Sequence, residues 1–579
     1  MGTRTAAEAM VDQLESYGVE YVFGTCGHTN IALLDAIGRS SITFVIARHE
    51  QAAAHAADGY ARASGRTGVV LMHVGPGLTN GVTGVLTAAL DSVPLVAIAG
   101  DIPSYYRGRH PHQEVNLHAD ADQAAIYRPF VKRAWQVHRA ADLARFTERA
   151  FWTAASGRPG AVLLSVPMDH FSRPAPADSG NTFPLAVPHR PALSADIADR
   201  IADLLIAAEK PLVYIGGGLR RGPGLDALRS MIEHLDIPVV HSLMAKGTLP
   251  DDHPLLLGMP GFWGLKMTNE YTREADVVLA LATRFAETDA SSWDDRYTWQ
   301  FPPGRLIQID IDPAEIGRNY PVEIGAVADV THAVQTIDTA VRARSPQPRR
   351  RDGLRETITT TRRTLFTDSR ERGTSDNFPL RPERILTDLR AILPADAVLV
   401  TDVGWNKNGV AQCYELPEQG RFITPGGAST MGFGPAAAVG VQLAEPERTV
   451  VALIGDGGMS AQLPALPMAV EQGAPVIFVV MNNRSHGTIS DLQSANFGQS
   501  FGCDFTGPDG TPYSPDFAAL GRACGADGYA VNSADDLGQT LRTALAARRP
   551  AVIDVPMVNE PVPTPGHWNI KDIYQGIFD

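Results

Sequence analysis

Short apolar runs recur along the whole chain and alternate with amphipathic stretches of helical length. Residues 68–74 (GVVLMHV) and 161–167 (AVLLSVP) are two such runs, and residues 50–64 (EQAAAHAADGYARAS) form one of the intervening stretches. Continuous apolar runs of this length are typical of strands buried on both faces, as in parallel sheets covered by helices. The chain is therefore predicted to be an α/β protein built from doubly wound parallel sheets.

The strand candidates fall into three blocks. A proline-rich stretch at 172–194 places a boundary near residue 180, and a basic stretch at 343–365 is typical of a linker or a solvated helix. The predicted division is an N-terminal domain at 1–180, a central domain at 190–345, a linker at 346–377, a C-terminal domain at 378–560 and a tail at 561–579. The strand candidates are residues 21–25, 43–47, 68–74, 94–100 and 161–167, then 211–218, 238–243, 276–283 and 305–313, then 397–404, 449–458, 475–483, 528–531 and 551–557.

Charge and cysteine content exclude several classes of partner. The 579 residues include 50 Lys and Arg against 64 Asp and Glu, a formal net charge of −14, which disfavours a nucleic-acid or anionic-membrane surface. The four cysteines lack the spacing of a disulfide framework or a zinc site, which fits a reducing cytoplasm. The sequence contains no signal-peptide pattern and no run of about 20 apolar residues. We expect a cytoplasmic protein with neither nucleic acid nor membrane as a partner.

A glycine-rich acidic turn follows the apolar run 449–454. Gly455, Asp456, Gly457 and Gly458 come directly after that run, and Asn482-Asn483 ends the run 475–481. Small residues at the end of a parallel strand let a polyphosphate approach the backbone. A magnesium ion would accept Asp456 and the amide oxygen of Asn483 as ligands beside phosphate oxygens. Each piece alone is more often an ordinary turn or a strand end.

Together the two pieces are far more specific, because residues 458–481 separate them. The sequence here resembles the thiamine-diphosphate enzymes, whose signature is Gly-Asp-Gly, some two dozen residues, then Asn-Asn. The resemblance implies that Asp456, Asn483 and the backbone carbonyl of Ser485 bind magnesium. It also implies three doubly wound domains. The N-terminal domain would bind the pyrimidine of the cofactor, the second would be the central domain, and the C-terminal domain would bind the diphosphate.

The resemblance covers nearly the whole chain and is strongest to the acetolactate synthase (acetohydroxyacid synthase) large subunit. The motifs that carry it are RHEQAAAHAADGYARASG (48–65), GPGLTN (75–80), HQE (112–114), GGG (216–218), MAKG (244–247), GMPGFWG (258–264), Arg284-Phe285, IDIDPAEIG (309–317), TDVG (401–404) and TMGFGPAAAVG (430–440). The same resemblance implies a homodimer or homotetramer with active sites between subunits.

Glu50 is the strongest catalytic candidate. A glutamate in RHEQ would otherwise be a solvated acid at a helix start. Thiamine chemistry needs a carboxyl group against the aminopyrimidine nitrogen, so that the exocyclic amine can accept the proton of the thiazolium carbon, and the resemblance gives Glu50 that role. Met431, followed by Gly432, matches the bulky residue that holds the cofactor bent.

Several residues depart from the acetolactate synthase pattern where substrate would bind. His28 replaces a small residue, His112 replaces a phenylalanine before the retained Gln113, and Leu492 replaces a specificity tryptophan. His73 resembles a histidine of benzoylformate decarboxylase. Three imidazoles near one cavity would suit proton transfer near neutral pH, although a structural role for each is equally open.

Two features concern the second substrate and the central domain. Arg284 matches the arginine that recognises the carboxylate of the second oxo acid, a task suited to the guanidinium fork. The GGG at 216–218 and the acids Asp310 and Asp312 resemble a dinucleotide site, without the full GxGxxG pattern. The resemblance suggests FAD there, with an adenine nucleotide or an empty site as alternatives, since Ala286-Glu287 replaces the family's acidic pair.

The predicted activity is a thiamine-diphosphate- and magnesium-dependent decarboxylation of a 2-oxo acid, with carboligation to a second carbonyl compound. A decarboxylase that releases an aldehyde without ligation is the near alternative. A catalytically silent paralogue that binds a nucleotide or a partner is the alternative of another class. An NAD-dependent oxidoreductase is disfavoured, because a complete fingerprint with its ribose-binding acid is missing.

Overall fold

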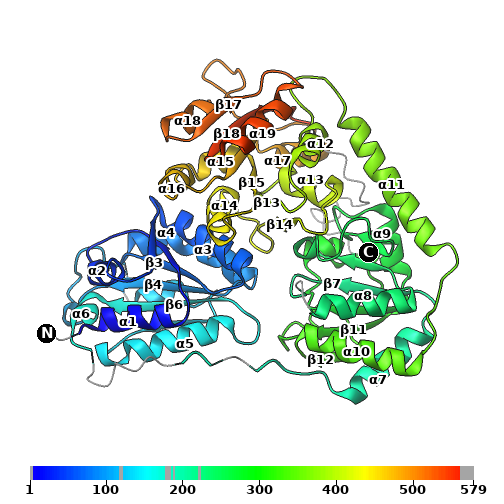
Figure 1. Ribbon diagram of the computed structural model, residues 1–579, viewed down its shortest axis with the longest axis horizontal. Coiled ribbons are helices and arrows are strands. Elements are labelled where there is room, and N and C mark those ends of the chain that lie inside the picture. Colours follow the sequence, from blue (N-terminus) through cyan, green and yellow to red (C-terminus); the bar gives the residue numbers. More distant parts are fainter. Residues whose placement is uncertain (1–3, 116–121, 176–183, 187–188, 220–222, 561–579) are drawn as a thin grey trace.

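The computed structural model describes residues 4–115, 122–175, 184–186, 189–219 and 223–560. The predicted boundary near residue 180 and the tail at 561–579 lie outside the described residues. Three six-stranded sheets, each parallel throughout, form three lobes (Figure 1). The α/β class with doubly wound parallel sheets is therefore confirmed.

The N-terminal sheet has the order β2-β1-β3-β4-β6-β5. Its strands β3 and β4 are buried at every position, which is the pattern that the apolar runs predict. The strands are β1 (Tyr21–Gly24), β2 (Thr43–Ile46), β3 (Gly68–Met72), β4 (Leu95–Asp101), β5 (Arg133–Gln136) and β6 (Ala161–Pro167); the helices are α1 (Ala6–Ser16), α2 (Ile31–Ile37), α3 (Glu50–Ser64), α4 (Pro76–Leu90), α5 (Leu143–Ala155) and α6 (Met168–Ser172).

The central sheet has a different order, β12-β11-β10-β7-β8-β9. Read from the other edge, this is the 3-2-1-4-5-6 order of dinucleotide-binding folds. The strands are β7 (Pro211–Ile215), β8 (Val239–His241), β9 (Leu256–Gly258), β10 (Val277–Leu281), β11 (Arg305–Asp310) and β12 (Ile324–Val327); the helices are α7 (Ala195–Ala207), α8 (Pro223–Leu235), α9 (Lys266–Glu274) and α10 (Val330–Arg344).

The C-terminal sheet, β14-β13-β15-β16-β18-β17, repeats the N-terminal order strand for strand. The strands are β13 (Val398–Thr401), β14 (Arg421–Ile423), β15 (Val450–Gly455), β16 (Ile477–Asn482), β17 (Asp527–Ala530) and β18 (Ala551–Pro556); the helices are α12 (Pro382–Ile392), α13 (Trp405–Cys413), α14 (Phe433–Ala444), α15 (Asp456–Ala461), α16 (Ala465–Glu471), α17 (Gly487–Phe497), α18 (Phe517–Ala523) and α19 (Asp536–Ala547).

The N-terminal and C-terminal domains share one core. A continuous cluster of buried apolar side chains runs from one sheet through α3 and α14 into the other. Two glycines allow the helices to touch, since a Cβ on Gly59 would lie 2.2 Å from the carbonyl oxygen of Ala437, and one on Gly440 would lie 1.8 Å from that of Ala56. The central sheet has its own clusters on its two faces.

Helix α11 (Leu354–Arg372) lies within the predicted linker and follows the outer edge of the molecule between the central and C-terminal lobes (Figure 1). Its Arg362 donates to Asp251 of the central domain at 2.9 Å, and Asp251 also accepts from Lys246 at 2.8 Å. The backbone N–H of Leu416 donates to the same carboxylate at 2.8 Å. This buried group therefore joins the helix to both lobes.

Candidate active site

The N-terminal and C-terminal sheets place their functional segments at equivalent points. In each sheet the strand order reverses between the first and third strands of the domain, and ligands of such folds bind outside the carboxyl ends of the strands at that reversal. Thr25 and His28 follow β1, and His73 follows β3. Asp402 follows β13, and Asp456 follows β15. The topology thus predicts two half-sites of similar position and different chemistry.

Three oxygens converge beside β15 and β16 in the C-terminal half-site. The side-chain oxygen of Asn483 lies 3.0 Å from Asp456 Oδ1 and 3.0 Å from the carbonyl oxygen of Ser485. The other end of the amide, Nδ2, donates to Asn559 Oδ1 at 3.0 Å. The remaining carboxylate oxygen of Asp456, Oδ2, is buried without a hydrogen-bond partner in the described part of the chain.

This arrangement fits a small hard cation. Oxygens on one edge of an octahedron with metal–oxygen bonds of about 2.1 Å lie about 3 Å apart. Reversing the Asn483 amide would instead give hydrogen bonds to Asp456 and Ser485, but it would set the amide oxygen against Asn559 Oδ1. Burial raises the pKa of Asp456 to about 6, and backbone amide donors such as that of Arg484 oppose the shift. Among the described residues, no three His, Cys, Asp or Glu side chains form a metal cluster, so a cation here would depend on the amide and carbonyl oxygens as well as on Asp456.

Asp402 organises the turns around this edge. Its carboxylate accepts hydrogen bonds from the backbone N–H of Gly434 at 2.9 Å and of Gly432 at 3.1 Å. Met431, which precedes Gly432, is 40% exposed. A Cβ on Gly458 would lie 2.6 Å from Asp402 Oδ1, so that glycine is required by packing. Burial raises the pKa of Asp402 to about 6, and the backbone donors oppose the shift. Asp402 was not among the predicted site residues, although TDVG was among the matching motifs.

Glu50 is the first residue of α3 and is almost fully buried. Its Oε1 accepts from the Thr25 hydroxyl at 2.6 Å, and its Oε2 accepts from Asn80 Nδ2 at 3.0 Å. Neither partner was among the predicted site residues, although Asn80 ends the GPGLTN motif. Two neutral donors hold the carboxyl group in one orientation without neutralising its charge.

The three predicted histidines lie together beside Glu50. The His28 and His73 rings meet edge to face with centroids 4.6 Å apart, and His112 stacks on His28 at 6.1 Å. His73 is fixed from both sides, by the Thr29 hydroxyl at 2.7 Å and by Gln113 Oε1 at 2.8 Å. Burial lowers the pKa of His28, and the charges of His73 and His112 lower it further.

Gly77 lies between the histidine cluster and Glu50. A Cβ on Gly77 would lie 2.9 Å from His73 Cβ and 3.2 Å from Glu50 Oε1, so only glycine fits between them. Leu492, half buried on α17, belongs to the C-terminal domain.

Within one chain, Glu50 and the three converging oxygens stand at opposite ends of a helix pair. Helices α3 and α14 are antiparallel, since Gly59 meets Ala437, Gly440 meets Ala56 and Arg62 lies 5.1 Å from the Phe433 ring centroid. Asp402 contacts the start of α14, next to Phe433. Glu50 lies 12 residues before Arg62, or roughly 18 Å along α3. One chain therefore does not bring its two half-sites together.

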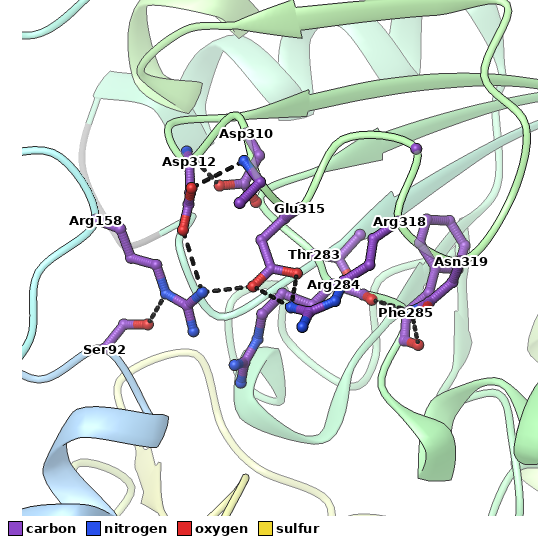
Figure 2. A network of polar contacts seen from close by, with 12 residues as sticks. Ser92, Arg158, Thr283, Arg284, Phe285, Asp310, Asp312, Glu315, Arg318 and Asn319 are labelled. Carbon is purple, nitrogen blue, oxygen red and sulfur yellow. Dashed lines mark hydrogen bonds and ion pairs between the residues drawn. The ribbon is translucent and has the colours of Figure 1, made fainter. Parts of the chain in front are cut away.

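Arg284 follows β10 in the central domain. Asn319 fixes its backbone by donating to the carbonyl oxygens of Arg284 and Phe285 at 3.0 and 3.1 Å. Among the described residues, its guanidinium makes no hydrogen bond or ion pair. Figure 2 shows it apart from the network in which Arg158 joins Ser92, Asp312 and Glu315 across the domain boundary.

The triple glycine at 216–218 follows β7, at the reversal of the central sheet between β7 and β10. A Cβ on Gly216 would lie 1.9 Å from the carbonyl oxygen of Ala282, and one on Gly218 would lie 2.6 Å from Ala282 Cβ. Gly217 faces Met244 in the same way, at 2.9 Å. The triple glycine is thus required for close packing between chain segments.

Comparison with known proteins gives the class first. Residues 4–126 match the N-terminal TPP binding domain of the thiamine pyrophosphate enzymes, residues 198–337 match the central domain, and residues 402–555 match the C-terminal TPP binding domain. The chain therefore belongs to the thiamine pyrophosphate (thiamine diphosphate) enzyme family. It is a thiamine-diphosphate-dependent enzyme of the decarboxylase and carboligase type.

Its relatives narrow the class. The chain is 33% identical to a probable acetolactate synthase large subunit of Methanocaldococcus jannaschii over 95% of this chain and 91% of the relative. It is 34% identical to the acetolactate synthase large subunit of Parasynechococcus marenigrum over 96% and 87%, and 33% identical to the acetolactate synthase isozyme 3 large subunit of Escherichia coli over 93% and 92%. The resemblance found in the motifs is thus confirmed over nearly the whole chain. No helix in the described part of the chain has the length and apolarity needed to cross a bilayer.

Proposed function

We propose that this enzyme decarboxylates a 2-oxo acid and joins the remaining fragment to a second carbonyl compound, as the name acetolactate synthase implies for its relatives. The observation that carries the proposal is the convergence of oxygens from Asp456, Asn483 and Ser485 beside the glycine-rich turn. Thiamine diphosphate, when bound, supplies the sink for the electron pair released with CO2. Everything else is done by groups of the chain.

Asp456, Asn483 and the Ser485 carbonyl would hold Mg²⁺, which in turn would hold the diphosphate. Gly455 leaves room for that group, since a Cβ there would meet only Asn406 Nδ2 at 3.8 Å. Met431, exposed just before Gly432 at the start of α14, would support the bend of the cofactor.

Glu50 would share a proton with the aminopyrimidine nitrogen. The hydrogen bonds from Thr25 and Asn80 keep its carboxyl group oriented for that transfer, and its burial excludes competing water.

The active enzyme is proposed to be a homodimer or homotetramer in which Glu50 of one chain serves the cofactor held by another. The antiparallel packing of α3 and α14 supports this, because it separates the two half-sites within a chain. Light scattering with simultaneous assay tests it, and an active monomer would contradict it.

A decarboxylase that releases an aldehyde is the second candidate, because the contact of three imidazoles favours proton delivery. Arg284→Gln should shift products toward aldehyde, whereas His73→Ala and His112→Phe should shift them toward ligation. The aldehyde-to-ligation ratio in these three variants at fixed pH decides between the two candidates, and an unchanged ratio would remove the roles of Arg284 and of both histidines.

FAD enters the proposal only through the resemblance, and no step is assigned to it. Absorbance near 450 nm and analysis of nucleotide released from the purified protein test its presence. A cytoplasmic location is also proposed, in keeping with four free cysteines.

The direct test of the function is incubation of the purified protein with thiamine diphosphate, Mg²⁺ and a panel of 2-oxo acids. Mass spectrometry should detect a ligated hydroxy-oxo acid that depends on both additions. Cofactor-independent turnover, or no CO2 release from any acid, would refute the proposal.

A further inference from the structure

Asp504 lies beside the turn that carries two of the three converging oxygens, and the proposed function gives it no role. It is an exposed residue of the segment that follows α17, and it forms an antiparallel bridge with Ser485. Backbone hydrogen bonds of 2.9 and 2.8 Å join residues 484–486 to residues 503–505 on both sides of this bridge. The segment is therefore fastened directly to the turn.

The carboxylate of Asp504 gathers several hydrogen bonds. Its Oδ1 accepts from the Ser485 hydroxyl at 2.7 Å and from Asn559 Nδ2 at 3.3 Å, and its Oδ2 accepts from the Ser500 hydroxyl at 2.8 Å. An ionised carboxylate accepts hydrogen bonds and donates none. Asn559 must therefore turn its NH2 group toward Asp504 and its side-chain oxygen away from it.

The orientation of Asn559 in turn decides that of Asn483. Asn559 Oδ1 accepts from Asn483 Nδ2 at 3.0 Å, so the side-chain oxygen of Asn483 faces Asp456 Oδ1 and the Ser485 carbonyl oxygen. A reversed Asn483 amide would instead donate to both of these oxygens, at 3.0 Å each. The reversed form would place an NH2 group where the cation is proposed to bind, so the two compete.

We propose that Asp504 and Asn559 form a relay that keeps the Asn483 oxygen turned toward the cation, and that Asp504 is a positioning residue for Mg²⁺ binding. The inference rests on the proposed magnesium and thiamine-diphosphate site. Asp504 also acts on a second ligand, because its contacts with Ser485 hold the turn whose backbone carbonyl is the third oxygen. Groups that orient metal ligands contribute about ten- to hundredfold to metal affinity.

Asp509 provides a matched control in the same segment. It is also exposed, and its carboxylate accepts from the backbone N–H of Thr511 at 3.1 Å and from the Thr511 hydroxyl at 2.7 Å. Within the described residues it makes no hydrogen bond to Asn559 or to the turn at 484–486. Replacing either aspartate by asparagine removes one charge at nearly constant volume. An effect of segment charge would appear in both variants, whereas an effect of the relay would appear only in Asp504→Asn.

The test is calorimetric titration of Mg²⁺ into the protein at saturating thiamine diphosphate. An amide at position 504 can donate as well as accept, so Asn559 and Asn483 become free to reverse. We expect the Mg²⁺ affinity of Asp504→Asn to fall about ten- to hundredfold, with kcat near the wild-type value once Mg²⁺ is saturating. Asp509→Asn should bind Mg²⁺ as the wild type does. Equal affinities in the wild type and in folded Asp504→Asn would overturn the inference.

Reversing the relay tests its direction. In the double variant Asp504→Asn with Asn559→Asp, the carboxylate moves to position 559, where it can accept from both Asn483 Nδ2 and the new amide. This variant should recover most of the Mg²⁺ affinity, and a loss as large as in Asp504→Asn would overturn the relay. Asn559→Ala leaves the serine contacts of Asp504 in place and should weaken Mg²⁺ binding to a similar extent. Wild-type affinity in Asn559→Ala would overturn the relay even if Asp504→Asn does not fold.

The titrations separate this inference from the proposed function. If the wild type binds Mg²⁺ and thiamine diphosphate but releases no CO2 from any 2-oxo acid, the proposed function has failed, and the Mg²⁺ affinities still decide whether the relay exists. If Asp456→Ala binds Mg²⁺ as tightly as the wild type, the metal site lies elsewhere and the relay is overturned with it.

Discussion

The N-terminal and C-terminal domains have the same strand order and meet through equivalent helices, yet their half-sites are stabilised differently. In the N-terminal half-site, both oxygens of Glu50 have hydrogen-bond donors from the chain. In the C-terminal half-site, Asp456 faces other oxygens and keeps one oxygen without a partner. Both oxygens of Glu50 are thus hydrogen-bonded within the protein, whereas Asp456 keeps one buried oxygen without a hydrogen-bond partner among the described residues.

The difference shows how one topology can serve two tasks. The reversal point supplies the same opening in both sheets, and the residues after two strands decide its chemistry. Glycines allow close contact across the reversal in both sheets. Gly27 follows the first strand, and a Cβ on it would lie 2.3 Å from the His73 ring after the third, whereas Gly458 follows the third strand, and a Cβ on it would lie 2.6 Å from Asp402 after the first. The imidazole side suits proton transfer, and the oxygen side suits metal and diphosphate binding.

The largest expected effect comes from Asp456→Ala, which removes the only carboxylate among the three converging oxygens. We expect the affinity for Mg²⁺ with thiamine diphosphate to fall a hundredfold or more, since even residues behind a metal ligand contribute about ten- to hundredfold. Calorimetric titration of the cofactor and metal analysis measure the loss. Asp509→Ala, at an exposed site in the same domain, is the control. Full cofactor occupancy in the Asp456 variant would show that the metal site lies elsewhere.

Glu50→Gln should distinguish the catalytic role of the N-terminal half-site from the cofactor-binding role of the C-terminal half-site. Cofactor affinity should stay nearly unchanged, while kcat falls by about two orders of magnitude or more through loss of a positioned proton-transfer group. Titration and steady-state rates on the same preparation measure both. Glu8→Gln, which disturbs the capping box of α1 and the ion pair of Glu8 with Arg39, should leave kcat unchanged. Wild-type turnover in Glu50→Gln would exclude the proton-transfer role.

The shared core predicts a coupled loss of stability. Gly440→Ala places a methyl group 1.8 Å from the Ala56 carbonyl oxygen, and we expect about 1–3 kcal/mol of destabilisation from overpacking. Hydrogen exchange should increase together in β3 and β15, while β7 and β10 keep their protection. Gly538→Ala in α19, where the nearest atoms lie 3.4 and 3.5 Å away, should be neutral or stabilising. Loss of protection in the central sheet alone would refute the coupling.

The fold class was predictable because strands buried on both faces leave a local signal, as in β3 and β15. The motifs also indicated where chemistry lies along the chain, and the roles of those residues stay predictions. What the sequence could not reveal depends on contacts between distant segments. Asn559 accepts a hydrogen bond from Asn483, 76 residues earlier in the chain. Lys407 lies near the Trp263 ring only because the central domain packs against α13. Local patterns carry no signal for such placement.

The smallest expected effect concerns the mutual influence of the histidines. Burial lowers the pKa of His28, and the charges of His73 and His112 lower it further. Because the folded pKa lies below the unfolded one, the unfolded chain binds this proton first as pH falls. The contribution of neutral His28 to stability is thus present above the ordinary histidine pKa and is lost as pH falls from that value through the lowered pKa of folded His28. His112→Phe keeps an aromatic ring on His28 but removes the charge, so the pKa of His28 should rise toward its ordinary value. NMR titration of the ring measures the change, and His332→Phe on α10 should leave it unaltered. A pKa of His28 that stays the same or falls in His112→Phe would show that the charge of His112 does not act on His28. Burial would then be the main cause of the lowered pKa of His28.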